Sequence, residues 1–212
     1  MRLSLIHIFG GFPLAGVYAG MKPVWASEIE PFPIRVTEKM CIRDSADTEG
    51  LNFRRAFKDA GFHISGVCIW VKNSLVLGRS PYQWQHEPVL FGWLPNGKHK
   101  WFADRKQTTV WSFDKPKHSK EHPTMKPIPL LAYPIKNSSA PNGVVMDLFG
   151  GSGSTLIACE QTDRICRTME LDPKYASVIV QRYIELVGSD EEVCVERDGE
   201  VIKHSQLDLT GK

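Results

Sequence analysis

The sequence predicts an α/β fold, because a strand, a glycine loop and a helix follow one another in its last third. The apolar run at residues 144–146 is typical of a buried strand, and it leads into a tight loop at residues 150–153. Residues 155–160 then have the composition of a helix. Strand, glycine turn and helix together form the first half of a nucleotide-binding unit.

A second apolar segment, residues 165–169, predicts the neighbouring strand, and Glu170 follows it directly. An acidic side chain about 20 residues after the first strand is placed to hold ribose hydroxyls. The glycines let the backbone approach a ligand, and the helix N-terminus presents free N–H groups to an anionic part of it. We therefore expect a nucleotide site. The alternative is a strand–turn–helix whose glycine turn is only structural.

The glycine loop fits neither of two common phosphate-binding patterns. No lysine follows Gly153, as a phosphate-cradling loop requires, and Leu156 stands where the dinucleotide fingerprint needs a third small residue. A ribose without a pyrophosphate fits better, which favours S-adenosylmethionine as the cofactor. A nicotinamide-dependent enzyme is the alternative, and Leu156 argues against it.

Composition bounds the class of protein. With 212 residues, 42% hydrophobic and 24% charged, the chain is long enough for one medium globular domain with a sizeable core. The formal net charge is only +2, so any nucleic-acid-binding surface must be local. Five scattered cysteines without a C-x-x-C pair indicate a reduced cytosolic protein with no zinc site and no disulfides. No apolar run approaches the ~18 residues of a membrane span.

Three motifs give the sequence a specific resemblance to a known family. They are Asp147-Leu-Phe-Gly-Gly-Ser-Gly-Ser-Thr155, Met169-Glu-Leu-Asp-Pro-Lys-Tyr175 and, upstream of both, His122-Pro-Thr-Met-Lys-Pro127. In this order they resemble the amino-methylating DNA methyltransferases, which modify adenine at N6 or cytosine at N4, in the permuted arrangement where the cofactor motif comes last. The resemblance covers about residues 46–187 and is strongest to adenine-specific enzymes of phages and prophages. It implies a Rossmann-like S-adenosylmethionine-dependent methyltransferase fold and double-stranded DNA as the substrate, in the cytoplasm of a bacterium or phage-infected host.

The same resemblance implies a set of cofactor-binding residues. They are Asp147, Phe149, Gly150, Gly151, Ser152, Gly153, Thr155, Glu170, Asp172, His122 and Lys126. In the family the motif at residues 122–127 closes over the methionine end of the cofactor, and Lys126 could pair with its carboxylate. The alternative is that Pro123 and Pro127 only begin a helix and that Lys126 is a surface charge.

Residues 72–110 carry turn signals but little periodicity, and in the resembled family this region takes part in target recognition. Aromatic residues are interleaved there with basic ones. The aromatic residues are Trp84, Trp93, Trp101 and Phe102, and the candidate DNA-binding residues are Lys98, Lys100, Arg105 and Lys106. Basic side chains neutralise phosphates, and aromatic faces can contact bases. The alternative is a partly buried aromatic cluster with solvated lysines.

Further elements follow from periodicity and caps. We expect a helix at residues 52–60 ended by Gly61, strands at 63–71 and 108–113, a helix at 128–135, a helix capped by Asp172 with Pro173 first and ended by Gly188, and a hairpin around 198–199 in the tail, residues 188–212.

The first 45 residues do not match the rest of the chain. Residues 9–16 and 24–32 resemble the start of a different family, the cytosine-5 DNA methyltransferases, but the Pro-Cys nucleophile of that family is absent. The stretches on either side match neither family. Our hypothesis is a chimeric chain with a junction near Ser45/Ala46, because about 30 residues is too short for a separate cofactor-binding domain. The alternative is a natural two-domain protein.

The catalytic motif of the resembled family is missing. Amino methylation needs a flipped base, an in-line methyl group and acceptors for the amino hydrogens, which the family supplies with Asp/Asn/Ser-Pro-Pro-Tyr/Phe/Trp. The printed sequence contains no such tetrapeptide, and the partial matches at residues 80–82 and 172–175 stand in the wrong places. We expect an incomplete fold without the catalytic-motif strand, little or no methyl transfer, and poor solubility from an unpaired sheet edge. The alternative is a non-catalytic module that binds DNA or S-adenosylmethionine.

Overall fold

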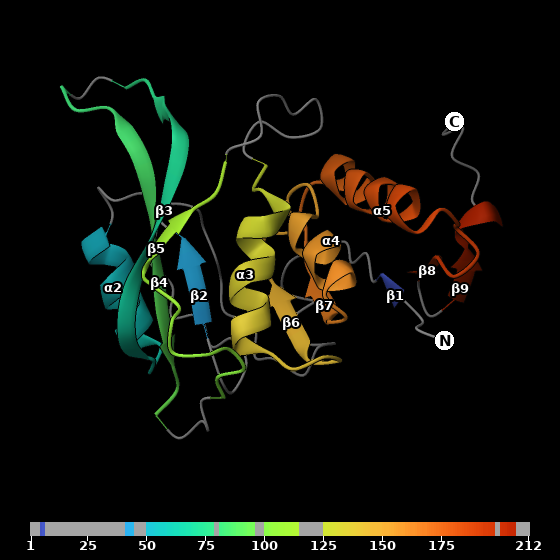
Figure 1. Ribbon diagram of the computed structural model, residues 1–212. Helices are drawn as coiled ribbons and strands as arrows, with labels where there is room; N and C mark the ends of the chain where they lie inside the picture. Colours follow the sequence, from blue (N-terminus) through green and yellow to red (C-terminus); the bar gives the residue numbers. More distant parts are fainter. Residues whose placement is uncertain are drawn as a thin grey trace.

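The computed structural model describes residues 5–6, 41–44, 50–78, 81–95, 100–114, 125–197 and 200–206 (Figure 1). Within these ranges there are three sheets, with strand orders β2-β4-β3-β5, β6-β7 and β1-β8-β9. The expectations for residues 9–39, Lys98 and His122 lie outside the described residues. A search of the same ranges finds no helix long and apolar enough to cross a membrane.

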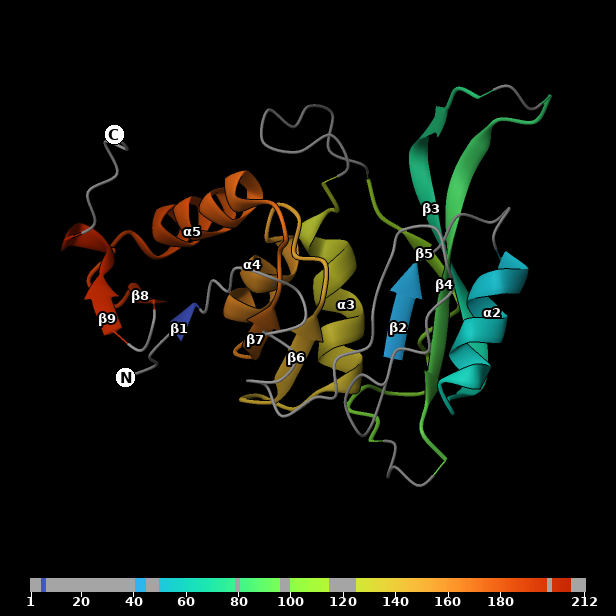
Figure 2. The ribbon, with the colours of Figure 1, turned by 180° about the vertical axis from the view of Figure 1, so that it is seen from behind.

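The four-stranded sheet is built around a long antiparallel hairpin. It consists of β3 (His63–Val76) and β4 (Trp84–Trp93), and its end extends beyond the rest of the sheet in both views (Figures 1 and 2). The short strand β2 (Cys41–Asp44) pairs antiparallel with β4, and β5 (Val110–Ser112) pairs parallel with β3. These four strands, with the helix between β2 and β3, are called the sheet half below.

Residues 72–110 carry turn signals and little periodicity, yet β3 and β4 both extend into that region. Pro88 was misleading, since a proline argues against a central strand. It lies inside β4, but β2 pairs with β4 only from Gly92 to Val89, so Pro88 stands just beyond the end of β2. Proline is therefore tolerated at this position of a central strand.

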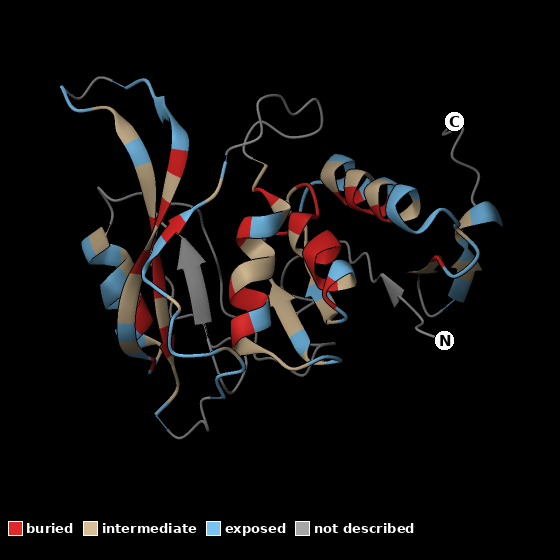
Figure 3. Cartoon of the chain, viewed as in Figure 1, coloured by how far each residue is buried: buried red, intermediate tan, exposed pale blue. Residues whose placement is uncertain are grey.

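Two helices cover the two faces of this sheet (Figure 3). α2 (Gly50–Asp59) packs around Phe57, Phe62 and Leu90, and α3 (Ile128–Ser138) packs on the opposite face. The core beneath α3 contains Cys68, Trp70, Val89, Trp111 and Leu130. Because side chains alternate along a strand, neighbouring β4 residues serve different cores. The predicted helices at 52–60 and 128–135 are confirmed, and so is Gly61 as the residue that ends α2, with φ +87°.

The glycine-loop half consists of β6 (Val144–Asp147), α4 (Ser154–Gln161), β7 (Ile165–Thr168) and α5 (Pro173–Val187). β6 and β7 pair in parallel, as expected for two strands joined by a helix. These four elements confirm the strand–loop–helix–strand unit predicted from the sequence.

The first strand of this unit is less buried than its apolar sequence predicted. Val144 is 59% exposed, and the rest of β6 is only partly buried. The described residues give β6 a partner strand on one side, β7, which leaves its other edge open. α3 covers the unit by packing Ile135 against Ala158 and Cys159 of α4, so this one helix packs against both halves.

The tail forms the predicted hairpin. β8 and β9 pair antiparallel with Arg197 opposite Glu200. Val193, just before β8, is buried against α5, so the tail is attached to the glycine-loop half. The bounds are Cys194–Arg197 for β8, Glu200–Lys203 for β9, Leu5–Ile6 for β1, which pairs with β8, and His204–Gln206 for the short helix η2.

Candidate functional site

The last residue of β6 fixes the shape of the loop that follows it. The Phe149 N–H donates to Asp147 Oδ1 at 3.0 Å, and the Thr155 hydroxyl donates to Asp147 Oδ2 at 2.6 Å. One carboxylate therefore joins the strand end, the loop and the first turn of α4. Two of the predicted cofactor residues, Asp147 and Thr155, have this clear structural role.

Glycine is required at the start of the loop by close packing. A Cβ on Gly150 would lie 2.5 Å from the Thr168 hydroxyl oxygen and 2.9 Å from Ile179 Cδ1. The Gly150 N–H donates to the Met169 carbonyl at 2.7 Å, so the loop lies directly against the end of β7. The backbone is left-handed at Gly153, with φ +78°, which is a conformation that glycine adopts without strain.

Glu170 clasps this loop from the end of β7. Its Oε2 accepts the Gly151 N–H at 2.6 Å, and its Oε1 accepts the N–H groups of Leu171 and Asp172 at 2.9 and 3.0 Å. A carboxylate offers about four acceptor positions, so roughly one remains for a ligand hydroxyl. The predicted ribose-binding acid thus stands at the loop with acceptor capacity to spare.

Two exposed apolar side chains stand directly after the ends of the two parallel strands. Phe149 follows β6 and is 48% exposed, and Leu171 follows β7 and is 71% exposed. Exposed apolar side chains at the carboxyl ends of parallel strands suit the flat face of a base. Leu171 was missed in the sequence, although an apolar residue directly after the strand-ending acid was the available signal.

α5 holds the loop from behind. Arg182 Nη1 donates to the Ser152 carbonyl at 2.5 Å and lies 3.5 Å from the Ser154 hydroxyl. Ser152 is 4% exposed, so its side chain faces the protein interior. Arg182 was not predicted, because nothing local in the sequence marks a contact between residues 30 positions apart.

Asp172 caps α5 as expected. Its Oδ1 accepts the Lys174 N–H at 2.9 Å, and Pro173 occupies the first helical position. The cap explains this aspartate without a ligand, so its contact with a cofactor stays a prediction.

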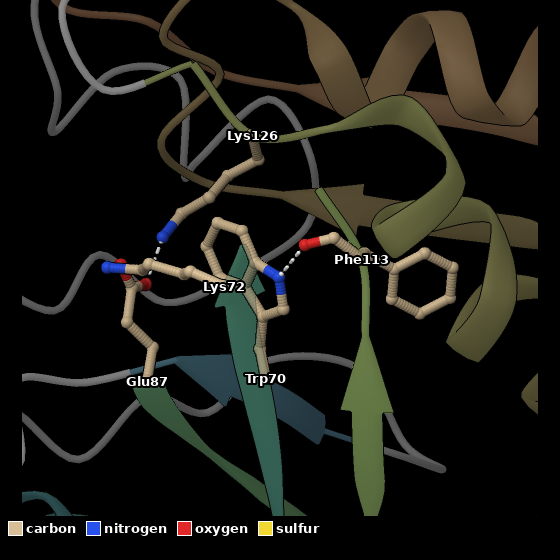
Figure 4. A network of polar contacts seen from close by, with 5 residues as sticks. All are labelled: Trp70, Lys72, Glu87, Phe113 and Lys126. Carbon is tan, nitrogen blue, oxygen red and sulfur yellow. Dashed lines mark hydrogen bonds and ion pairs between the residues drawn. The ribbon is translucent and has the colours of Figure 1, made fainter. Parts of the chain in front are cut away.

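Lys126 belongs to a polar network at the start of α3 (Figure 4). Its ammonium group bonds Glu87 Oε2, while Lys72 Nζ lies 2.6 Å from Glu87 Oε1. The two Nζ atoms lie 5.0 Å (Lys126) and 5.3 Å (Lys72) from the centre of the Trp70 ring, whose N–H donates to the Phe113 carbonyl at 2.8 Å. Lys72 and Glu87 were missed, because their meeting depends on strand register.

The candidate DNA-binding residues lie at the other end of α3. Lys100, Arg105 and Lys106 are exposed, and the Phe102 N–H donates to the carbonyl of Asn137 near the end of that helix at 2.8 Å. α3 has 11 residues, which corresponds to about 16 Å. The structure therefore does not bring these basic residues together with Lys126, which precedes the first residue of α3.

The described ranges contain no group of three or more His, Cys, Asp or Glu side chains that could hold a metal ion.

Comparisons with solved structures identify the fold. The chain is similar to the crystal structure of an M1.HpyAVI–SAM complex, with 22% identity, 68% of this chain and 74% of that chain covered, and a TM-score of 0.60. It is also similar to the PvuII DNA methyltransferase (cytosine-N4-specific), with 18% identity, 65% and 57% covered, and a TM-score of 0.54. These likenesses confirm the predicted α/β methyltransferase fold.

Sequence comparison identifies the family. M.Cfr9I, a type II methyltransferase of Citrobacter freundii, is 34% identical over 161 residues, which are 69% of this chain and 53% of the relative. The chain spans about half or less of the length of the first curated relatives that it matches. The sequence model of the DNA methylase family N6_N4_Mtase matches residues 37–181, which is more than half of the chain. The chain therefore belongs to the family of N6/N4 DNA methylases, which are S-adenosylmethionine-dependent.

Proposed function

We propose that this chain is the cofactor-binding and target-recognition part of an S-adenosylmethionine-dependent DNA methyltransferase. The observation that carries the proposal is the Glu170 clasp, which shapes the glycine loop and leaves an acceptor for a ribose hydroxyl. The exposed side chains of Phe149 and Leu171 beside it supply apolar contacts for the adenine ring. We place the protein in the cytoplasm.

Methyl transfer itself requires more than this site. The target base must leave the helix, and its amino group needs acceptors that turn the lone pair toward the methyl group. The printed sequence has no Asp/Asn/Ser-Pro-Pro-aromatic motif to supply them. We therefore propose that the chain binds the cofactor but transfers little or no methyl by itself. Affinity for S-adenosylmethionine distinguishes this proposal from the alternative of a module that binds only DNA.

The proposed target is the N6 amino group of adenine, on the strength of the resemblance to phage adenine methyltransferases. Cytosine N4 is the second candidate, because the PvuII enzyme that shares the fold is named cytosine-N4-specific. Chromatography of nucleosides from treated DNA separates N6-methyladenine from N4-methylcytosine, so any label that is transferred assigns the target.

Contact with double-stranded DNA is proposed for Lys98, Lys100, Arg105 and Lys106. Each lysine or arginine that neutralises a phosphate contributes about one unit to the slope of log affinity against log salt. An Arg105→Ala variant should lower that slope by about one, while Lys58→Ala on the exposed side of α2 should not. Equal slopes for Arg105→Ala and the unmodified protein would remove Arg105 from the DNA surface.

The chimeric origin of residues 1–45 is a separate proposal. It is supported by the resemblance of residues 9–16 and 24–32 to a different family, although the match to the DNA methylase model begins at residue 37, before Ser45/Ala46. Resequencing the source DNA across the codons for residues 36–50 tests it. A different upstream reading frame encoding the missing motif supports the junction, and an uninterrupted frame contradicts it.

Calorimetry with S-adenosylmethionine and a radiolabelled methyl-transfer assay test the function together. We expect saturable binding that Glu170→Gln weakens at least tenfold, since the clasp and the ribose contact both depend on this carboxylate. Glu185→Gln, on the exposed side of α5, is the matched control. Absence of binding would contradict the cofactor assignment, and robust turnover on mixed-sequence DNA would contradict the proposed inactivity.

A further inference from the structure

The loop that carries the candidate DNA-binding residues is tied to α3 at two points. The Phe102 N–H donates to the carbonyl of Asn137 at 2.8 Å, and Asn137 is buried. The Tyr133 hydroxyl donates to Gln107 Oε1 at 2.7 Å, and Tyr133 packs against the core beneath α3. Residues 100–109 are therefore attached to the folded core on both sides of their middle, although most of them are exposed (Figure 3).

Asp104 organises the stretch between these two points. Its Oδ1 accepts the Lys106 N–H at 2.9 Å and the Gln107 side-chain amide at 2.7 Å. Its carbonyl accepts the indole N–H of Trp101 at 2.9 Å. The bonds from Lys106 and then Gln107 lower the pKa of the Asp104 carboxyl below its ordinary value, so it is ionised at neutral pH. One exposed residue thus fixes the backbone on both sides of Arg105.

An acidic side chain is unexpected in the middle of a surface that is proposed to bind DNA. The exposed basic residues Lys100, Arg105 and Lys106 all lie within four positions of Asp104 along the chain. A carboxylate repels phosphates, so its charge by itself weakens binding. Its hydrogen bonds offset this repulsion, because a loop whose backbone is already fixed loses less conformational entropy when it binds a partner.

We propose that Asp104 is a positioning residue for DNA binding, which holds Arg105 and Lys106 in place for the phosphates of a duplex and contacts no DNA itself. This inference rests on the proposed function and adds a residue that a search for positive charge excludes. Its consequence is the direction of an effect. Loss of the hydrogen bonds of Asp104 should weaken DNA binding, whereas the loss of a negative charge alone should strengthen it.

Fluorescence anisotropy of a labelled mixed-sequence duplex, measured over a range of salt concentrations, tests this direction. We expect Asp104→Ala to bind about tenfold more weakly, with a slope of log affinity against log salt that falls by about two, since two side chains lose their phosphates. Asp104→Asn removes the same charge but keeps the Oδ1 acceptor, so it should bind at least as tightly as the unmodified chain. Asp114→Ala, at an exposed aspartate after β5, is the matched control and should not weaken binding.

Asp104→Ala should still fold, because Asp104 is exposed. An unchanged melting temperature reports the fold, and an unchanged affinity for S-adenosylmethionine reports the glycine-loop half. The Lys106 amide hydrogen reports the loop itself. Its exchange with solvent, followed by nuclear magnetic resonance, should be faster in Asp104→Ala and unchanged in Asp104→Asn, because only the alanine variant lacks an acceptor for it.

The outcomes distinguish this inference from the function on which it rests. If the unmodified chain does not bind the duplex, the proposed DNA contact fails and the inference fails with it. If the unmodified chain binds and Arg105→Ala lowers the salt slope, but Asp104→Ala binds as tightly or more tightly, the positioning role is overturned while the function stands. If Asp104→Asn weakens binding as much as Asp104→Ala, the carboxylate itself contacts the DNA and the inference is wrong.

Discussion

In the glycine-loop half the carboxylates bind backbone N–H groups, whereas in the sheet half a carboxylate binds ammonium groups. Asp147, Glu170 and Asp172 each accept N–H groups from residues within 19 positions along the chain. Glu87 is bound to Lys126, 39 positions away, and to a lysine on the neighbouring strand. The first arrangement shapes a loop, and the second joins elements that are distant in sequence.

This contrast predicts where each half is vulnerable. Loop-shaping carboxylates lie in partly exposed positions, where water can replace a lost bond. In the sheet half Lys72 is buried, with 7% of its side chain exposed, so removal of its carboxylate partner leaves a buried charge without compensation. Loss of a charge should therefore be more severe in the sheet half.

The largest expected effect is that of Glu87→Gln. This change leaves the buried Lys72 ammonium group without its carboxylate, and breaking a buried pair costs about 3–5 kcal/mol. Urea unfolding followed by circular dichroism measures this loss of unfolding free energy. Lys72→Met is the matched comparison, because it removes the buried charge itself, and it should change the free energy of unfolding by less than about 1 kcal/mol. Equal losses in the two variants would contradict the view that an unpaired buried Lys72 charge causes the loss in Glu87→Gln.

The second effect is a pH dependence specific to the sheet half. Burial raises the pKa of the Cys68 thiol from 9.0 to about 11. The unfolded chain therefore loses this proton first, and stability that is present below pH 9 is lost as the pH rises to 11. One pKa unit corresponds to ~1.4 kcal/mol, so the loss is about 2–3 kcal/mol.

Cys68→Ala isolates this loss. The free energy of unfolding of the unmodified chain should fall more between pH 8 and pH 11 than that of Cys68→Ala. The cost of the smaller side chain does not depend on pH, so it cancels in this comparison. Parallel curves of unfolding free energy against pH for the two proteins would contradict the raised pKa of Cys68. In the glycine-loop half the pKa of Cys166 is also raised, but chiefly by its hydrogen bond with Cys159 and then by burial.

The third effect concerns the packing of the glycine loop. Gly150→Ala places a methyl group 2.5 Å from the Thr168 hydroxyl oxygen. Overpacking of this kind should lower the free energy of unfolding by about 1–3 kcal/mol. The variant should also abolish S-adenosylmethionine binding, because the loop has to move. Differential scanning fluorimetry and calorimetry measure the two losses. At Gly66 in β3 a Cβ meets nothing within 4 Å, so Gly66→Ala is the control. Normal cofactor affinity in Gly150→Ala would show that close approach at this position is not needed.

The same contrast explains what could be predicted from the sequence. The glycine-loop half was predicted element by element, because Asp147, Gly153 and Asp172 act on residues within a few positions of themselves. The long hairpin was not predicted, since Pro88 argues against a central strand until the short reach of β2 is known. Arg182 and Lys72 likewise act through contacts that only the folded chain creates.

The smallest effect is that of the cap of α5. Asp172→Ala removes the acceptor for the Lys174 N–H, and loss of an N-cap costs about 1 kcal/mol. Asp172→Asn keeps a capping oxygen and should restore the stability. Because the Asp172 N–H, and not its side chain, binds Glu170, cofactor affinity should change little in either variant. If Asp172→Asn restores stability but affinity for S-adenosylmethionine stays low, the carboxylate itself contacts the cofactor and Asp172 is more than a cap.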